Sequence, residues 1–136
     1  MSQFFWLTSQ ALDGLRYWWP ITVVLSLLVV IAVVHTFLFK RSQFRKIHLF
    51  TFSPLLLSML VLVWGSAMAH HGLGRGPAWA SNVVGILWLL QIPLTIALIY
   101  FMRGVRLFAT AVLLFELWFG SLCSFMAAMS VSNVWL

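Results

Sequence analysis

Residues 20–39 read PITVVLSLLVVIAVVHTFLF, a run of twenty residues without Asp, Glu, Lys or Arg. A helix needs about 20 consecutive, mainly apolar residues to cross the hydrocarbon core of a bilayer. Three further, mainly apolar runs follow, at about 47–69, 82–102 and 107–129, and only the last of them contains a charged residue. In lipid each backbone polar group must find its partner within the span, which favours helices even where β-branched residues are common. The sequence therefore predicts an all-α integral membrane protein with four transmembrane helices.

The overall composition agrees with a membrane protein. The chain is 63% hydrophobic and 7% charged, with a mean hydropathy of +1.06, whereas soluble domains carry about 25% charged residues. The net charge of +6 resides in short segments between apolar runs and not on a basic surface domain, so nucleic-acid binding is excluded. The expected partners are the lipid bilayer and either other membrane subunits or further copies of the chain.

The segment before the first span differs in character. In residues 1–19, MSQFFWLTSQALDGLRYWW, aromatic and aliphatic residues recur at helical spacing with polar residues between them. Such a pattern is typical of an amphipathic helix that lies in the headgroup zone, with its aromatic rings as anchors; the alternative is a frayed N-terminal tail. We therefore divide the chain into an interfacial helix, residues 1–19, and a four-helix transmembrane domain, residues 20–136.

Basic residues predict how the chain is threaded. Two turns on the same side of a four-span chain hold six of the eight: Lys40, Arg41, Arg45, Lys46, Arg103 and Arg106. The opposite side holds only Arg16 and Arg75. Because cytoplasmic loops are enriched in Lys and Arg, both turns should be cytoplasmic and touch lipid headgroups, with both termini outside. This threading predicts an antiparallel bundle, which we assign to a bacterial inner membrane because almost no mass protrudes.

The run VLLFELWFG, residues 112–120, carries Glu116, one of only two acidic residues in the chain. It lies ten residues after Arg106, which at 1.5 Å per residue is about 15 Å, the middle of a core about 30 Å thick. An ionised carboxylate at this depth costs on the order of 3 kcal/mol or more, so Glu116 should face protein or trapped water. Two interpretations stay open: a proton- or ligand-binding site, and a buried hydrogen bond that sets helix register or docks a subunit.

Neighbouring residues supply a setting for this carboxyl group. Gln91 lies at a similar depth in the third span, Thr95 shares its face, and Pro93 leaves one backbone carbonyl without its helical partner. We expect Gln91 to hydrogen-bond Glu116, so that these groups form one polar spot. On the fourth span a stripe of small residues, spaced by four, gives a seam where another helix can approach closely: Gly120, Ser124 and Ala128.

Four histidines are candidate ligands. His35 and His48 should both lie in the cytoplasmic third of adjacent spans, where two imidazoles can hold one b-type haem or a metal. His70 and His71 open the loop of residues 70–81 and are candidates for a metal if that loop is extended. The alternative for each pair is an interfacial or loop histidine bonded to headgroups or to the backbone.

Three functions remain open from the sequence. The first is an integral, accessory subunit of a larger membrane complex or a homo-oligomer. The second is a small transporter or channel with Glu116 as its midplane site, and the third is a b-haem electron-transfer subunit. With no nucleophile–base pair, paired carboxylates or substrate domain in the sequence, we expect no catalytic activity from the chain on its own.

Overall fold

The computed structural model describes residues 2–40, 46–69 and 76–133, and every regular element in these ranges is helical. Five are α-helices and one is a 3₁₀ helix that leads directly into α3. The elements are α1 (Ser2–Tyr17), α2 (Trp19–Phe39), η2 (Lys46–Phe52), α3 (Ser53–Ala67), α4 (Ala78–Phe101) and α5 (Arg106–Ser132).

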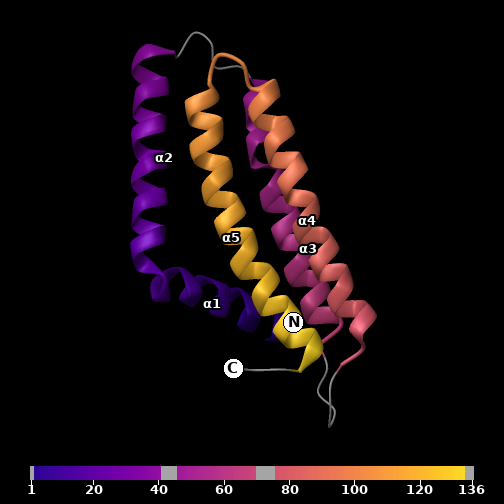
Figure 1. Ribbon diagram of the computed structural model, residues 1–136. Coiled ribbons are helices and arrows are strands. Elements are labelled where there is room, and N and C mark those ends of the chain that lie inside the picture. The colour runs from indigo at the N-terminus through magenta and orange to yellow at the C-terminus, as the bar shows by residue number, and fades with distance from the viewer. Residues whose placement is uncertain (1, 41–45, 70–75, 134–136) are drawn as a thin grey trace.

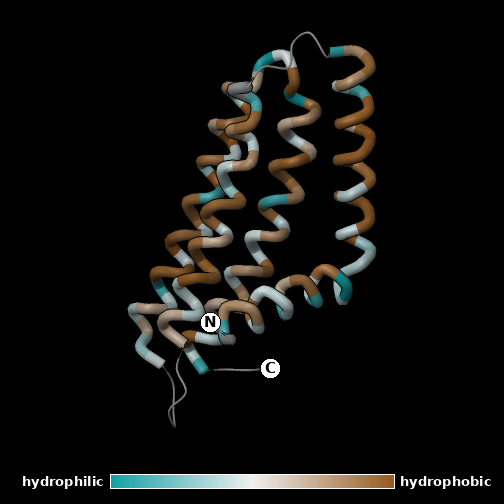
Figure 2. Tube along the Cα trace, turned by 180° about the vertical axis from the view of Figure 1, so that it is seen from behind, coloured by the Kyte–Doolittle hydropathy of each residue, from teal (hydrophilic) through white to brown (hydrophobic). Residues whose placement is uncertain are grey.

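Four of the helical segments are long and apolar enough to cross a membrane: Trp19–Phe39, His48–Ala67, Ala78–Phe101 and Arg106–Ser132. The chain reverses direction between successive long helices, while α1 lies across one end of the assembly (Figure 1). Hydrophobic residues predominate along the long helices, and α1 is of mixed polarity (Figure 2). Four apolar helices are what the sequence predicts for a small membrane protein.

Helix α5 is the centre of the fold, since it packs against α1, α2, α3 and α4. Near its start it forms an apolar cluster with the end of α4, whose buried members are Met102, Val105, Phe108, Ala109, Val112 and Leu113. Towards its other end it meets α1, and there the buried residues Leu7 and Ala11 pack with Phe119 and Cys123. One face of α1 is thus used for packing within the protein.

Helix α2 is attached differently. It packs mainly against α5, with a smaller contact to α1 at the corner between the two helices. Figure 1 shows α2 at the edge of the group of long helices, with α5 between α2 and α4. Most of its apolar side chains are exposed in the isolated chain, as lipid-facing residues would be.

The helix boundaries differ from the sequence-based spans at the second, third and fourth. The second span opens with the 3₁₀ helix η2, and its α-helix α3 begins only at Ser53, with Pro54 in its first turn. Helix α4 begins at Ala78, four residues before the predicted start, because Pro77 is extended (φ −68°, ψ 125°) and the turn that follows it is packed. Ala80 is fully buried, and its carbonyl accepts a hydrogen bond of 3.1 Å from the Trp64 indole. Helix α5 continues to Ser132 and ends where Asn133 adopts a left-handed conformation (φ 53°).

Helices α3 and α5 approach each other closely at Gly65. A Cβ atom placed there would lie 2.6 Å from the Cβ and 2.8 Å from the Cα of Ala127. Atoms this close overlap, so the crossing requires glycine. The Ser130 hydroxyl donates to the Gly65 carbonyl at 3.3 Å beside the same contact, which ties the two helices together there.

Candidate functional site

Glu116 lies in the first half of α5 and is buried, with 4% of its surface exposed. Its Oε2 atom has no hydrogen-bond partner among the described residues. Burial follows from the position of α5 in the centre of the fold, where neighbouring helices cover most of its faces. The sequence prediction that this carboxyl group would face the interior is consistent with the structure.

A second polar group lies one helical turn further along. Gln91 of α4 is fully buried, and its Nε2 donates to the Ser58 hydroxyl of α3 at 3.4 Å. The Gln91 Oε1 atom lies against Gly120 of α5, where a Cβ atom would collide with it. Three helices therefore contribute to one polar contact near the middle of the long helices, and the absence of a side chain at Gly120 makes room for the amide.

The sequence led us to expect a hydrogen bond between Gln91 and Glu116. In the structure Gln91 is instead hydrogen-bonded to Ser58. The reason is the relative register of the two helices. Helices α4 and α5 run in opposite directions (Figure 1), and Gln91 is level with Gly120. The residue four positions after Gln91 on α4 is therefore level with the residue four positions before Gly120 on α5. Thr95, 5% exposed, is thus at the height of Glu116.

Several polar atoms in this region are buried without a hydrogen-bond partner in the described part of the chain. Those on α4 and α5 are Gln91 Oε1, Thr95 Oγ1, Glu116 Oε2 and Ser124 Oγ. Buried polar groups in proteins are nearly always hydrogen-bonded, to protein or to water. These atoms on two facing helices therefore have hydrogen-bonding capacity that the described side chains leave unused.

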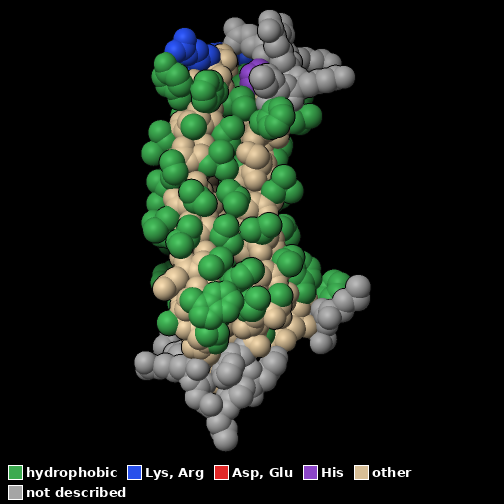
Figure 3. Space-filling model, turned by 90° about the vertical axis from the view of Figure 1, so that its right-hand side faces the viewer, with side chains coloured by type: hydrophobic (Ala, Val, Ile, Leu, Met, Phe, Trp, Pro, Cys, Tyr) green, Lys and Arg blue, Asp and Glu red, His purple; other side chains and the backbone are tan. Residues whose placement is uncertain are grey.

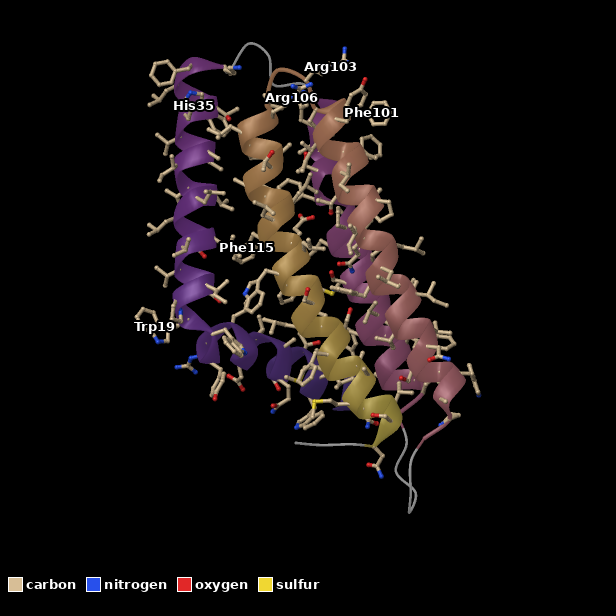
Figure 4. All side chains as sticks on the ribbon, viewed as in Figure 1. Trp19, His35, Phe101, Arg103, Arg106 and Phe115 are labelled. Atoms are coloured by element: carbon tan, nitrogen blue, oxygen red, sulfur yellow. The ribbon has the colours of Figure 1, made fainter. Side chains whose placement is uncertain are left out.

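Glu116 also lines a cavity of about 420 Å³ between α2, α5 and the η2–α3 segment. The other lining residues are apolar except for one hydroxyl; they are Ser26, Val29, Val30, Val33, Phe52, Leu55, Phe108, Val112 and Phe115. Figure 4 shows Phe115 between α5 and α2. The cavity falls in the range of about 300–1,000 Å³ that is typical of small-molecule sites, and Glu116 is the only ionisable group among the described residues that line it.

The small-residue seam predicted on α5 is largely used inside the chain. Gly120 and Ser124 are buried, the first against Gln91 and Ser58. Ser124 and Ala128 line a separate hollow between α4 and α5. The seam thus brings α3 and α4 close to α5 within one molecule.

Of the candidate histidine ligands, the structure describes His35 and His48, and they lie on elements with different packing partners. His35 lies on α2, which packs against α5 and α1, whereas His48 lies in η2, which packs against α5 and α3. His35 stacks on Phe39 with ring centroids 5.2 Å apart, and His48 is 5% exposed. No group of three or more His, Cys, Asp or Glu side chains suited to a metal occurs in the described ranges. His70 and His71 lie outside the described residues.

Except for Arg16 on α1, the basic residues that the structure describes lie at one end of the long helices. Figure 4 places Arg103 and Arg106 at the same end as His35, and Figure 3 shows Lys and Arg side chains collected at one end of an otherwise apolar face. Arg103 donates to the Tyr100 hydroxyl at 2.9 Å. Lys40 follows α2 at this end, whereas Arg41, Arg45 and the side chain of Lys46 lie outside what the structure describes.

Sequence reasoning did not find the tryptophan hydrogen bonds between helices. The Trp118 indole of α5 donates to Thr22 of α2 at 3.3 Å, and the Trp88 indole of α4 donates to Ser121 of α5 at 3.0 Å. Sequence reasoning also left Ser58 out of the polar site. The only sequence signal for these contacts is the presence of a hydroxyl or indole side chain within a predicted span. The spacing of residues along one helix does not reveal which side chain of another helix such a group contacts.

Comparisons with known proteins add no family to this description: no protein-family model, curated protein or solved structure matches the chain significantly.

Proposed function

We propose that the chain is a small membrane transporter in which Glu116 is the group that binds and releases a proton or a ligand. One observation carries the proposal. Glu116 is a buried carboxyl group near the middle of the central helix, its Oε2 has no partner among the described residues, and it lines a cavity between helices.

The energetics favour a working role over a purely structural one. A buried polar group without a partner costs on the order of 1–3 kcal/mol, and a buried charge costs more. A hydrogen bond between transmembrane helices returns only about 0.6 kcal/mol on average. A glutamate that served helix packing alone would be expected to form such a bond, as Gln91 does with Ser58. A buried acid that lines an apolar cavity and forms no such hydrogen bond is better explained by reversible binding of a proton or a ligand.

No other described ionisable side chain lines the cavity. The titratable groups on elements packed against α5, and on α5 itself, lie elsewhere: Asp13, Arg16, Tyr17, His35, His48, Tyr100, Arg106 and Cys123. Proton exchange at this site is therefore assigned to Glu116 alone.

The proposed setting is an antiparallel four-helix bundle in a bacterial inner membrane. In it α1 lies in the outer headgroup zone, where its exposed aromatic residues Phe5, Trp6 and Tyr17 serve as anchors. The end that carries Arg103 and Arg106 faces the cytoplasm, and both termini face outward. The supports are the alignment of the four apolar helices and the charge difference between their two ends.

Infrared difference spectroscopy of the protein in lipid nanodiscs tests this function without knowledge of the substrate. As the pH is stepped, we expect a reversible carbonyl-stretch signal from a protonated carboxyl group. The signal should disappear in Glu116→Gln and persist in Asp13→Asn, the matched control that removes the other acid. A carboxyl signal from Glu116 that stays constant across the accessible pH range would overturn the proposal, because a structural group need not exchange its proton.

A second function is supported by the exposed surface of α2. This helix buries little of itself in the isolated chain, and large apolar residues around it are exposed, among them Val24, Ile31 and Leu38. Such a surface suits a neighbouring transmembrane helix as well as lipid. In this proposal the chain is an accessory subunit of a larger membrane complex or a homo-oligomer.

Gentle detergent extraction, followed by intact-complex mass and an absorption spectrum on the same peak, separates these functions. Other polypeptides or further copies in the peak would support the subunit proposal, and a chain that runs alone would contradict it. A Soret band that is lost in His35→Ala would instead support the b-haem alternative, which a colourless peak would contradict.

A further inference from the structure

We infer that the ligand of the Glu116 cavity is a membrane-dissolved amphiphile with an apolar body and one protonated amine, which enters between α2 and α3 and exchanges with a proton on Glu116. This inference rests on the proposed function, because it names the substrate class of the same site.

The lining of the cavity sets the chemistry of the ligand. Aliphatic and aromatic side chains from α2, η2, α3 and α5 form its walls, and they match an apolar body. The polar groups are the Glu116 carboxyl and the Ser26 hydroxyl. A carboxylate in apolar surroundings is stabilised by an opposite charge that also donates hydrogen bonds. A substituted ammonium group provides both, whereas an anion or a neutral polar solute provides neither the charge nor a fit to the walls.

The packing of α2 sets the route. The cavity has α2 on one side and the η2–α3 segment on the other, yet α2 packs mainly against α5 and does not form a packed interface with α3. The cavity therefore lies at a seam between helices that face the bilayer. Lining residues on both sides of this seam are themselves partly exposed in the isolated chain, with Val30 at 57% and Phe52 at 45%. A ligand dissolved in the lipid reaches Glu116 sideways, without crossing the basic end of the molecule.

The exchange conserves charge. In the empty state Glu116 holds a proton and is neutral. When the ammonium ion binds, the O–H bond of the carboxyl group breaks, the proton leaves to water, and the carboxylate pairs with the cation. One positive charge enters and one leaves, so the cavity is neutral in both states and avoids the cost of an unpaired buried charge.

Proton release measures this exchange directly. The protein in nanodiscs, in weakly buffered solution, is mixed with decylammonium chloride, and the pH change is corrected with empty nanodiscs. We expect close to one proton released per chain at saturation, no release with decan-1-ol, which has the same apolar body without the charge, and none from Glu116→Gln. Val30→Trp, which fills the cavity from an exposed position on α2, should also abolish release while leaving the carboxyl group in place.

The outcomes separate the two proposals. If Glu116 titrates in the infrared experiment but decylammonium releases no proton, the ligand class is wrong and the proposed function stands. If Glu116 does not titrate at all, both fall. Release of the same size from Glu116→Gln or from Val30→Trp would show that the amine acts elsewhere, which also overturns the inference.

Cross-linking tests the route of entry. Cysteines at Val33 of α2 and Leu55 of α3, both lining the cavity, are joined by a cleavable thiol-specific linker in a Cys123→Ala background. We expect the linker to slow amine-induced proton release at least tenfold and its cleavage to restore the rate. Unchanged release in the linked protein would refute entry between α2 and α3.

Discussion

Replacing Gly65 by alanine is the sharpest test of the packing, because the structure predicts which glycine does not tolerate a methyl group. The added Cβ would lie 2.6 Å from the Cβ of Ala127 and 2.8 Å from its Cα. Carbon atoms in contact prefer about 3.5–4.0 Å, so α3 and α5 must separate by roughly 1 Å at this point. Neither contacting atom is the end of a flexible side chain, and the strain cannot be relieved by a rotamer change.

The expected cost follows from that displacement. Overpacking of a well-packed interior costs about 1–3 kcal/mol, and the Ser130 hydrogen bond to the Gly65 carbonyl adds about 0.6 kcal/mol if it is lost. We therefore expect Gly65→Ala to lower the free energy of unfolding by about 2–3 kcal/mol. Adding Ala127→Gly to this variant should restore part of the loss, because it removes the nearer of the two clashing atoms.

The assay is equilibrium unfolding in mixed micelles, followed by circular dichroism, with Gly85→Ala as the matched control. A Cβ at Gly85 would meet nothing within 4 Å, and alanine has the higher helix propensity, so this variant should be as stable as the parent or slightly more so. Gly120→Ala should fall between the two, since it meets the end of the Gln91 side chain, which can move. Equal stability of Gly65→Ala and Gly85→Ala would refute the close crossing of α3 and α5.

Three further predictions concern the contacts of α2, the polar site and the threading of the chain. A double-mutant cycle of Trp118→Phe and Thr22→Val should give a coupling free energy of about 0.5–1.5 kcal/mol for the hydrogen bond that holds α2 to α5, measured by unfolding; zero coupling would contradict that bond. Gln91→Met, which keeps the side-chain volume, should cost less than about 1 kcal/mol, because the bond it removes is long, and a loss above about 3 kcal/mol would mean a much tighter network. Single cysteines at Lys40 and Tyr17 should react with an impermeant maleimide only from the cytoplasmic and the outer side respectively, and labelling of both from one side would refute the proposed orientation.

Much of the architecture followed from the sequence because lipid restricts what a chain can do. An apolar run such as residues 20–39 has to be helical if it crosses a bilayer, whatever its neighbours are. The prediction of four such helices is therefore confirmed by length and composition. Local chemistry also placed the start of α2 near Pro20, which lies in its first turn. The start of α4 was predicted less well, because the burial of Ala80 depends on a tryptophan from another helix.

The sequence predicted which residues lie in the candidate site, but not which hydrogen bonds they form. Depth along a helix can be counted from the nearest charged turn, which put Glu116, Gln91 and Thr95 in the same layer. Which of these side chains meet depends on the relative register of α4 and α5. The register differs by one helical turn from the expected one, so Gln91 hydrogen-bonds Ser58 and not Glu116. The sequence contains no local signal for that register, because it results from how side chains on several helices interlock.

The sequence by itself determined that this protein consists of apolar helices of membrane-spanning length, that one isolated acid lies deep in the last of them, and that most basic residues lie at one end. These properties depend on whether each segment is more stable in lipid or in water, and that follows from its amino-acid composition. Only the tertiary structure decided that α5 is the central helix, that α2 packs chiefly against it, and that Glu116 lines an apolar cavity and does not hydrogen-bond the Gln91 amide. Those properties depend on close contacts such as Gly65 on Ala127 and Gly120 beneath Gln91, where a single methyl group decides how near two helices can come.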